Sequence, residues 1–513
     1  MAADTARSLL IRNARLVPVG VDRHGRTPDR ATVPRHPVDV RIRDGVVHEV
    51  GAHLAARGER EHQADERFLI PGLWDQHVHW EQWAETLTRV DVSGAGSAAD
   101  VVALMAAAIA ALPDDDAAVL GFGYRSALWS EPATVAQLDA VSGRHPVVVV
   151  SGDAHNGWLN SRALGLLGLP PREEVMVERP WFDTLARLNE LPGAETQAGL
   201  ERARADAARR GVVGITDFEF NSPFRVWPER VAGGTVSLRV RASTYPDRLD
   251  EAIALGLRTG DILDELGLVT MGPLKVITDG SLNTRTAWCL EAYPDPAGLV
   301  YPYGVVNVPP DELDDLLGRA TTAGIEVAVH AIGDAAVRAA LDSFAATGAR
   351  GSIEHAQLIA YDDIPRMADL GVTASMQPAH LLDDRDVTMR IWPDRHHRCF
   401  LTHALVAEGV PVAFGSDAPV SRLDPWLQMA AAVFRGSDER EQWHAAEALT
   451  PAQALACSTD GQGTVAPGSR GDVVLLDDDP TEARGDARES AAMLREMRVA
   501  MTVVDGRVVH LAL

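Results

Sequence analysis

Eight short apolar segments follow one another through the middle of the sequence, and stretches with a helical pattern separate most of them. The segments are rich in β-branched residues and mostly open after Gly or Pro, which is typical of buried strands. Eight strand-then-helix units in series predict an α/β protein built on a (β/α)8 TIM barrel. An open, doubly wound sheet is the alternative. The segments lie near residues 68–79, 211–220, 236–244, 268–279, 325–334, 351–359, 371–378 and 409–417.

The connection between the first two strands is far longer than an ordinary loop. It spans roughly 130 residues, whereas loops beyond about 12–15 residues without secondary structure are uncommon. Helix-like and strand-like segments occur within it. We therefore expect residues 84–206 to form an insertion, or cap subdomain, within a barrel at residues 67–464.

The two ends of the chain share a different pattern, in which short segments of alternating apolar and polar residues are separated by tight turns. Asp44-Gly45 near the start and Asp505-Gly506 near the end are both signals for hairpin turns. Neither end is long enough to form a stable sheet alone. The sequence therefore predicts that residues 1–66 and 465–513 combine into one small β-sandwich.

Charge and composition narrow the class of protein. The 513 residues carry a net charge of −25 at pH 7, which argues against nucleic acid or an anionic membrane as the main partner. Three cysteines are too few for a disulfide framework and suit a reducing compartment. We recognise neither a signal peptide nor an apolar run of about 18 residues. The expectation is a soluble, cytoplasmic protein that is large enough to be an enzyme.

The basic residues are almost all arginine, and Lys275 is the single lysine among 48 basic side chains. An amine can lose its proton and react, whereas a guanidinium practically cannot. Two plainer explanations are chance and a buried lysine paired with Asp279. Because Lys275 lies within a predicted barrel strand, we also treat it as a candidate for chemistry.

Residues that commonly bind metals gather at the ends of the predicted strands. His77 and His79 are two positions apart, so both imidazoles face the same side of the first strand. His330, His355 and Asp417 end later strands, where barrel enzymes place their catalytic groups. Taken singly, either of the later histidines could be a core residue and Asp417 a helix cap. Together, four imidazoles and one carboxylate suit a borderline cation such as Zn²⁺.

Lys275 could supply the bridging anion that a pair of metal ions needs. We find no Glu or Asp on the middle strands that offers one. A neutral lysine amine can take up CO2 and become a carbamate, which arginine cannot do. A hydroxide held between two ions about 3.5–4 Å apart is a nucleophile at neutral pH. Asp417 would then take the proton of the water and pass it to the leaving group.

Other residues are candidates for contact with the substrate. Asp279 and Arg285 follow the fourth strand, and Arg285 could either clamp a carboxylate or form an ion pair with Asp279. His380 follows the seventh strand and could polarise a carbonyl or be a surface histidine. Further side chains could line a pocket for an apolar substrate portion or simply pack in a core; these are Trp80, Tyr124 and His155.

Several motifs occur in a fixed order: PGLWDQHVHW, LKVITDGSLNTRTA, VHAIGDAA, SIEHAQ, SMQPAH and FGSDAPV. In this order they resemble the amidohydrolase superfamily, specifically the YtcJ-like (amidohydrolase 3) branch that includes N-substituted formamide deformylases. GDAHNGWLNSRAL resembles the cap motif of that branch, and LTPAQALA followed by APGSRGDVVLLDDDP resembles its closing segment. The resemblance covers essentially the whole chain.

The resemblance implies a metal-dependent hydrolytic site with one or two ions. Lys275 favours two, for which Zn is expected, and a homodimer is a family-level expectation. We therefore expect a metal-dependent hydrolase of amide or N-formyl C–N bonds. The alternatives are the same chemistry on an ester, lactone or cyclic imide, or a catalytically silent binding protein. The implied roles are His77 and His79 on the first ion, Lys275 as a carboxylated bridge, His330 and His355 on the second ion, and Asp417 as the proton shuttle at the metal.

Overall fold

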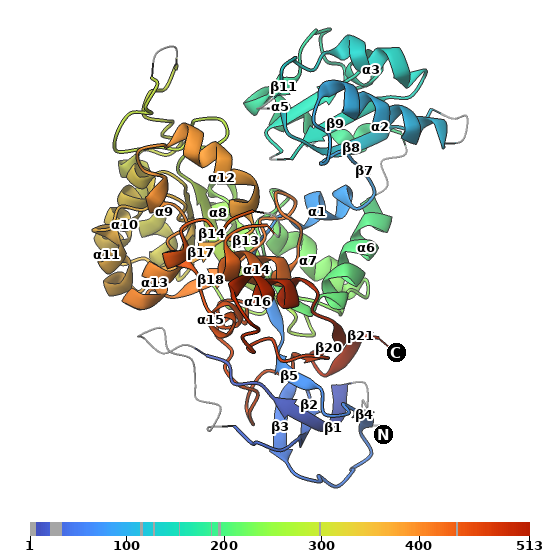
Figure 1. The fold of residues 1–513 in the computed structure, drawn as a ribbon, viewed down its shortest axis with the longest axis vertical. Helices are drawn as coiled ribbons and strands as arrows, with labels where there is room; N and C mark the ends of the chain where they lie inside the picture. The colour runs from blue at the N-terminus through green and yellow to red at the C-terminus, as the bar shows by residue number, and fades with distance from the viewer. Residues whose placement is uncertain are drawn as a thin grey trace. The chain divides into compact units, whose positions relative to one another are not determined.

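A computed structural model describes residues 7–20, 33–112, 116–126, 129–152, 154–185, 187–192, 196–296, 299–437 and 440–512. The chain divides into two compact units (Figure 1). The first unit consists of Met1–Val78, Ala205–Asp417 and Leu423–Leu513, and the second of His79–Arg204 and Ala418–Arg422. Within the described residues, no helix combines the length and the apolar character needed to cross a membrane.

The first unit contains the (β/α)8 barrel that the sequence predicts. Eight parallel strands pair in chain order, each with its neighbour. Strands of a parallel sheet are buried on both faces, which explains why they read as continuous apolar runs. The strands are β6 (Leu73–Val78), β12 (Val212–Asp217), β13 (Arg239–Thr244), β14 (Val269–Ile277), β15 (Val327–Ala331), β16 (Gly351–His355), β17 (Thr373–Met376) and β18 (Val412–Phe414).

Helices follow the barrel strands. Two of them, α9 and α10, end at Gly324 and Gly348, which have φ values of +78° and +66°; glycine adopts this left-handed conformation without strain. The helices of this unit are α7 (Pro223–Ala232), α8 (Pro246–Ala254), α9 (Pro310–Ala323), α10 (Asp334–Thr347), α11 (Asp363–Leu370), α12 (His380–Ile391), α13 (Thr402–Glu408), α14 (Pro425–Phe434), α15 (Pro451–Ala456) and α16 (Ala487–Arg495). A further helix, α6 (Thr196–Arg209), precedes β12.

Hydrogen bonds join the first barrel strand to the last. Oδ1 of Asp75 on β6 accepts from the backbone N–H groups of His77 and Ser416, at 3.1 and 2.8 Å. The N–H of Asp417 donates to the carbonyl of His77 at 2.7 Å. Burial of Asp75 away from water raises its pKa to about 7. These contacts close the barrel and fix the chain at the ends of β6 and β18.

A second sheet of the first unit is built from both ends of the chain (Figure 1). The two expected hairpin turns join β2 to β3 and β20 to β21, and all four turn residues have positive φ, as such turns require. The N-terminal strands are β1 (Ser8–Leu16), β2 (Val38–Arg43), β3 (Val46–Gly51), β4 (Arg60–Gln63) and β5 (Phe68–Pro71), and the C-terminal strands are β19 (Val473–Leu476), β20 (Val499–Val504) and β21 (Arg507–Leu511).

Strand β5 connects the two halves of this sheet, because it pairs with both β1 and β19. It falls within the range 67–464 that the sequence analysis assigned to the barrel. The boundaries of the terminal sandwich, the barrel and the insertion at 84–206 therefore remain proposals.

The second unit has its own five-stranded sheet, in the order β11-β10-β9-β8-β7. Tyr124 and Trp158 are buried in its core. The strands are β7 (Val90–Asp91), β8 (Val119–Tyr124), β9 (Val147–Ser151), β10 (Asn156–Leu159) and β11 (Met176–Val177), and the helices are α1 (Trp80–Thr86), α2 (Ala98–Ala110), α3 (Val135–Ser142), α4 (Ser161–Leu166) and α5 (Glu178–Leu185).

Candidate metal centre

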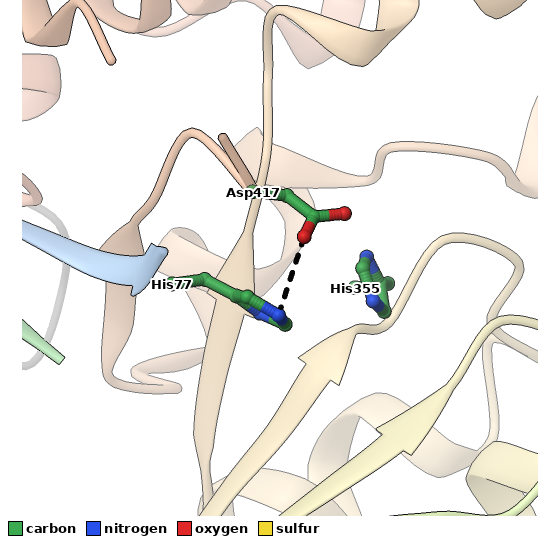
Figure 2. A group of neighbouring side chains, drawn as sticks. All are labelled: His77, His355 and Asp417. Carbon is green, nitrogen blue, oxygen red and sulfur yellow. Dashed lines mark ion pairs between the residues drawn. The ribbon is translucent and has the colours of Figure 1, made fainter. Parts of the chain in front are cut away.

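Three of the predicted ligands meet at the C-terminal ends of the barrel strands (Figure 2). They are His77 on β6, His355 on β16 and Asp417 just after β18, and all three are buried. One potential ligand atom of each lies within 4.8 Å of the others, and Nε2 of His77 is 3.4 Å from Oδ1 of Asp417. Among the described residues this is the only group of three or more such side chains.

Two members of this cluster have unusual backbone conformations. His355 has a φ of +69° and Asp417 a φ of +54°. Residues other than glycine rarely adopt the left-handed region, and doing so costs on the order of 1–3 kcal/mol. Strain of this kind gathers at functional sites, where the surrounding structure enforces it. The backbone therefore supports a functional role for these two strand ends.

The donor set fits a borderline divalent ion. Ligand atoms bound about 2.1 Å from a tetrahedral zinc ion lie about 3.4 Å apart, which is the separation between His77 and Asp417. Nδ1 of His355 is buried and makes no hydrogen bond to any described residue, although buried polar atoms normally have a partner. Burial also lowers the pKa of His355, and the neutral imidazole is the form that binds metals.

Lys275 lies inside the barrel beside this cluster. Its side chain is 1% exposed, and Nζ is 3.3 Å from Nε2 of His77 and 4.4 Å from the ring centre of Phe218. Burial lowers the pKa of Lys275 to about 8, although the negative charges of Glu354 and Asp417 oppose this change. The sole lysine is thus held against one of the expected ligands.

His330 is the next-to-last residue of β15, and its ring centre is 4.5 Å from that of His355. Its Nε2 lies 3.3 Å from the carbonyl oxygen of Gly280 and 3.4 Å from Oδ1 of Asp279. Asp279 is fully buried, and burial raises its pKa to about 7. The carboxylate of Asp279 accepts hydrogen bonds from the backbone N–H groups of Trp288, Ile332 and Gly333. Asp279 therefore holds the surrounding loops in place.

His380 and Arg285 differ in their positions relative to the cluster. His380 begins α12, is buried, and has Nε2 3.9 Å from Oδ2 of Asp417, so it lies beside the cluster. Arg285 is half-buried in the loop after β14. Within the described part of the chain, neither Arg285 nor Lys275 forms an ion pair with Asp279.

Four of the predicted site residues belong to the second unit, and none of them is part of the cluster. Trp80 begins α1 and is buried, and Tyr124 packs against Trp158 in the core of the five-stranded sheet. The ring of His155 lies 5.2 Å from that of Phe182. The fourth is His79, at the first position of the unit.

The sequence analysis did not identify Glu354, which precedes His355 on β16. Glu354 is fully buried, and its Oε2 lies 2.7 Å from Nδ1 of His77. A carboxylate on a middle strand therefore contacts Nδ1 of a predicted ligand, a contact that was not anticipated from the sequence. The available signal was the spacing of Ser352 and Glu354, because two polar residues two positions apart share one face of an otherwise apolar strand.

Comparisons with known proteins extend over nearly the whole chain. The model of a family described as the amidohydrolase family matches residues 61–510. The chain is 25% identical to the putative amidohydrolase YtcJ of Bacillus subtilis over 521 residues, covering 92% of this chain and 95% of that protein. It is 24% identical to the N-substituted formamide deformylase of Arthrobacter pascens over 534 residues, covering 91% and 94%.

A solved structure has a similar fold. The crystal structure of an uncharacterized metal-dependent hydrolase from Pyrococcus horikoshii matches with a TM-score of 0.74 and 24% sequence identity. The match covers 93% of this chain and 98% of that one. This likeness establishes the shared fold.

Proposed function

The chain belongs to the amidohydrolase family, and from this premise we propose that it is a metal-dependent hydrolase of a C–N bond in a small molecule. The observation that carries the proposal is the buried cluster of His77, His355 and Asp417 at the C-terminal ends of the barrel strands. The name of the Arthrobacter relative, an N-substituted formamide deformylase, favours an amide or N-formyl group as the bond that is cleaved.

His77, His355 and Asp417 would hold a divalent ion, which when bound would lower the pKa of a water and polarise the carbonyl of the substrate. The protein's own residues hold the reactants and move the proton. Asp417 accepts the proton of the attacking water and returns it to the leaving amine as a general base and then a general acid. His380, next to Asp417, donates a hydrogen bond to the carbonyl oxygen as negative charge develops on it.

We extend the proposal to two ions, with zinc as the metal that these donors suit. His330 would belong to the second site. Lys275 would become a ligand for the ions once its amine nitrogen bonded to the carbon of CO2 and released one proton, which gives a carbamate. The burial of Lys275 and its 3.3 Å distance from Nε2 of His77 support this role.

Metal content per chain, measured by elemental analysis with bicarbonate present, tests both parts of the proposal. We expect two equivalents in the unaltered protein and one or fewer in Lys275→Ala. One equivalent in both proteins would overturn the two-ion site and leave a mononuclear hydrolase. No metal in either protein, after expression with ample zinc, would overturn the hydrolase and favour a binding protein.

Substrate class requires a separate assay. Purified protein is incubated with a panel of N-formyl and N-acyl amines, and the released amine is quantified. We expect release from this panel and little from matched esters, lactones and cyclic imides. Hydrolysis of the second group alone would overturn the choice of a C–N amide bond.

A further inference from the structure

A buried carboxylate lies behind the candidate metal centre, and the chemistry described so far gives it no role. Glu354 on β16 is 0% exposed, and its Oε2 is 2.7 Å from Nδ1 of His77. A buried carboxylate is costly unless hydrogen bonds or an opposite charge compensate it. The hydrogen bonds of Glu354 therefore indicate the role of this carboxylate.

Two hydroxyl groups hold Glu354 in place. Oγ of Ser352 donates to Oε1, and Oγ of Ser375 donates to Oε2 at 2.6 Å. Ser352 lies on the same strand two residues earlier, and Ser375 is the register partner of Glu354 on β17. Because two neighbouring strands fix the carboxylate, the imidazole of His77 is oriented by the carboxylate and not the reverse.

The carboxylate also selects the tautomer of His77. A carboxylate oxygen that already receives a hydroxyl hydrogen acts as an acceptor, so the hydrogen shared with His77 belongs to Nδ1. In a neutral ring Nε2 then keeps its lone pair. Nε2 is the atom that lies 3.4 Å from Oδ1 of Asp417 and 3.3 Å from Nζ of Lys275, on the side of the candidate ligands.

We infer that Glu354 is a positioning residue, which binds Nδ1–H of His77 and thereby presents Nε2 to the metal ion. The inference rests on the proposed function, since it assumes that His77 binds metal. Glu354 itself touches neither the ion nor the substrate and acts only through His77. Carboxylates in this position typically contribute 10–100-fold to the metal affinity of a site.

The test measures zinc affinity of the metal-free protein by competition with a chromogenic chelator. Glu354→Gln keeps the shape of the side chain but offers either an oxygen or an NH2 group to His77. We expect it to bind zinc about 10–100-fold more weakly. Ser352→Ala is the matched control, because it removes a hydroxyl from Oε1, the oxygen that does not contact His77, and we expect it to lose much less affinity.

A second readout is the tautomer of His77, measured by ¹⁵N NMR of the metal-free proteins. We expect the Nδ1–H form in the unaltered protein and a mixture of tautomers in Glu354→Gln. A purely structural role would instead lower the melting temperature and leave the tautomer and the affinity unchanged, which would overturn the inference. If the unaltered protein binds no zinc, the proposed function itself is overturned.

Discussion

At the scale of single residues, the carboxylates near the candidate centre differ in what they bind. Asp75 and Asp279 are buried, and both accept hydrogen bonds from backbone N–H groups. Asp417 instead faces two imidazoles, with one oxygen 3.4 Å from Nε2 of His77 and the other 3.9 Å from Nε2 of His380. A group that moves protons must reach the reacting atoms. The contacts of Asp417 therefore agree with its proposed role, while those of the other two favour support of the loops.

This difference gives a prediction for Asp417→Asn and His380→Gln. We expect Asp417→Asn to lower kcat by about 10²–10⁴-fold and to reduce metal content, because Asp417 is both ligand and proton carrier. His380→Gln should keep its metal and lower kcat by about 10²–10³-fold, as the loss of a donor to a developing oxyanion does. The measurements are metal content and kcat on an amide found by the screen. Full activity in His380→Gln would contradict the prediction.

At the scale of elements, the strands were predictable because both faces of each are buried and their sequences show it. The positions of the adjacent side chains of Glu354 and His355 could not be predicted in the same way. In a regular strand adjacent side chains point to opposite faces, so only one of the two was expected at the centre. His355 has a φ of +69°, and this break in the strand lets both residues contact His77. The pattern of residue types carries no signal of such a break.

A contact between His396, before α13, and His444, after α14, gives a prediction for stability in acid. Nδ1 of His396 and Nε2 of His444 are 3.0 Å apart, so one ring nitrogen must remain an unprotonated acceptor. Burial, together with the smaller effects of the nearby charges of His396, Arg435, His397 and Arg385, lowers the pKa of His444 to about 4. An unfolded histidine has a pKa near 6.5. Stability from this group is therefore present above about pH 6.5 and is lost as the pH falls toward 4.

We expect the melting temperature of the unaltered protein to fall between about pH 6.5 and pH 4, and to fall less in His444→Gln. Measurements across this range compare the two proteins with His53→Gln, which changes an exposed histidine in the bend after β3. The His53 variant should follow the unaltered protein. Equal pH dependence in all three would show that His444 does not cause the acid sensitivity.

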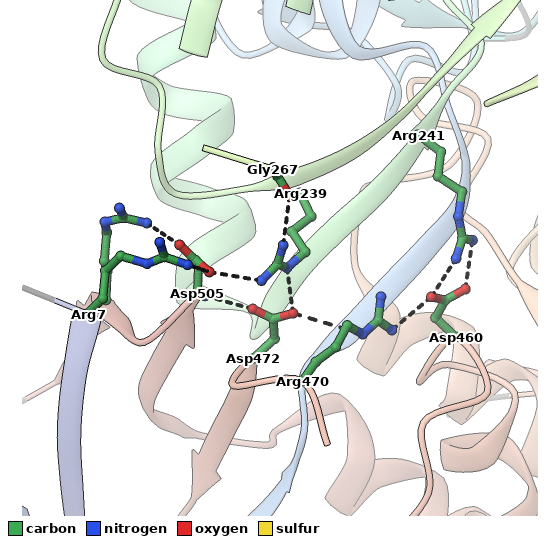
Figure 3. A network of polar contacts seen from close by, with 9 residues as sticks. Arg7, Arg239, Arg241, Gly267, Asp460, Arg470, Asp472 and Asp505 are labelled. Carbon is green, nitrogen blue, oxygen red and sulfur yellow. Dashed lines mark hydrogen bonds and ion pairs between the residues drawn. The ribbon is translucent and has the colours of Figure 1, made fainter. Parts of the chain in front are cut away.

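At the scale of the whole molecule, the terminal sheet and the barrel are joined by a chain of alternating arginine and aspartate side chains (Figure 3). Arg239 on β13 contacts Asp472 at 2.6 Å and Asp505 at 3.2 Å. Both carboxylates are almost fully buried, which makes these pairs different from surface ion pairs. This series of ion pairs links the N-terminal end, the barrel and the C-terminal end of the protein. Its members are Arg7, Asp505, Arg239, Asp472, Arg470, Asp460 and Arg241.

The sequence predicted that the two ends combine into one small β-sandwich, because neither end alone is long enough to form a stable sheet. It did not indicate this ion-pair chain, since Arg239 and Asp472 are separated by 233 positions. Such pairs arise only when the fold brings distant segments together. Charge patterns reveal pairs within a helix or between adjacent strands, and none of these patterns applies here.

Arg239→Met should therefore destabilise the protein much more than the loss of an ordinary arginine. The change leaves two buried aspartates without one of their partners, and breaking a buried ion pair costs about 3–5 kcal/mol. Arg319→Met is the matched control, because Arg319 pairs with the exposed Asp250, and exposed pairs contribute about 0–1 kcal/mol. Thermal unfolding of both variants, with limited proteolysis of the terminal strands, measures the difference. We expect earlier melting and faster cleavage at residues 499–513 only in Arg239→Met. Equal behaviour of the two variants would mean that the apolar contacts of the terminal sheet hold it to the barrel without the ion-pair chain.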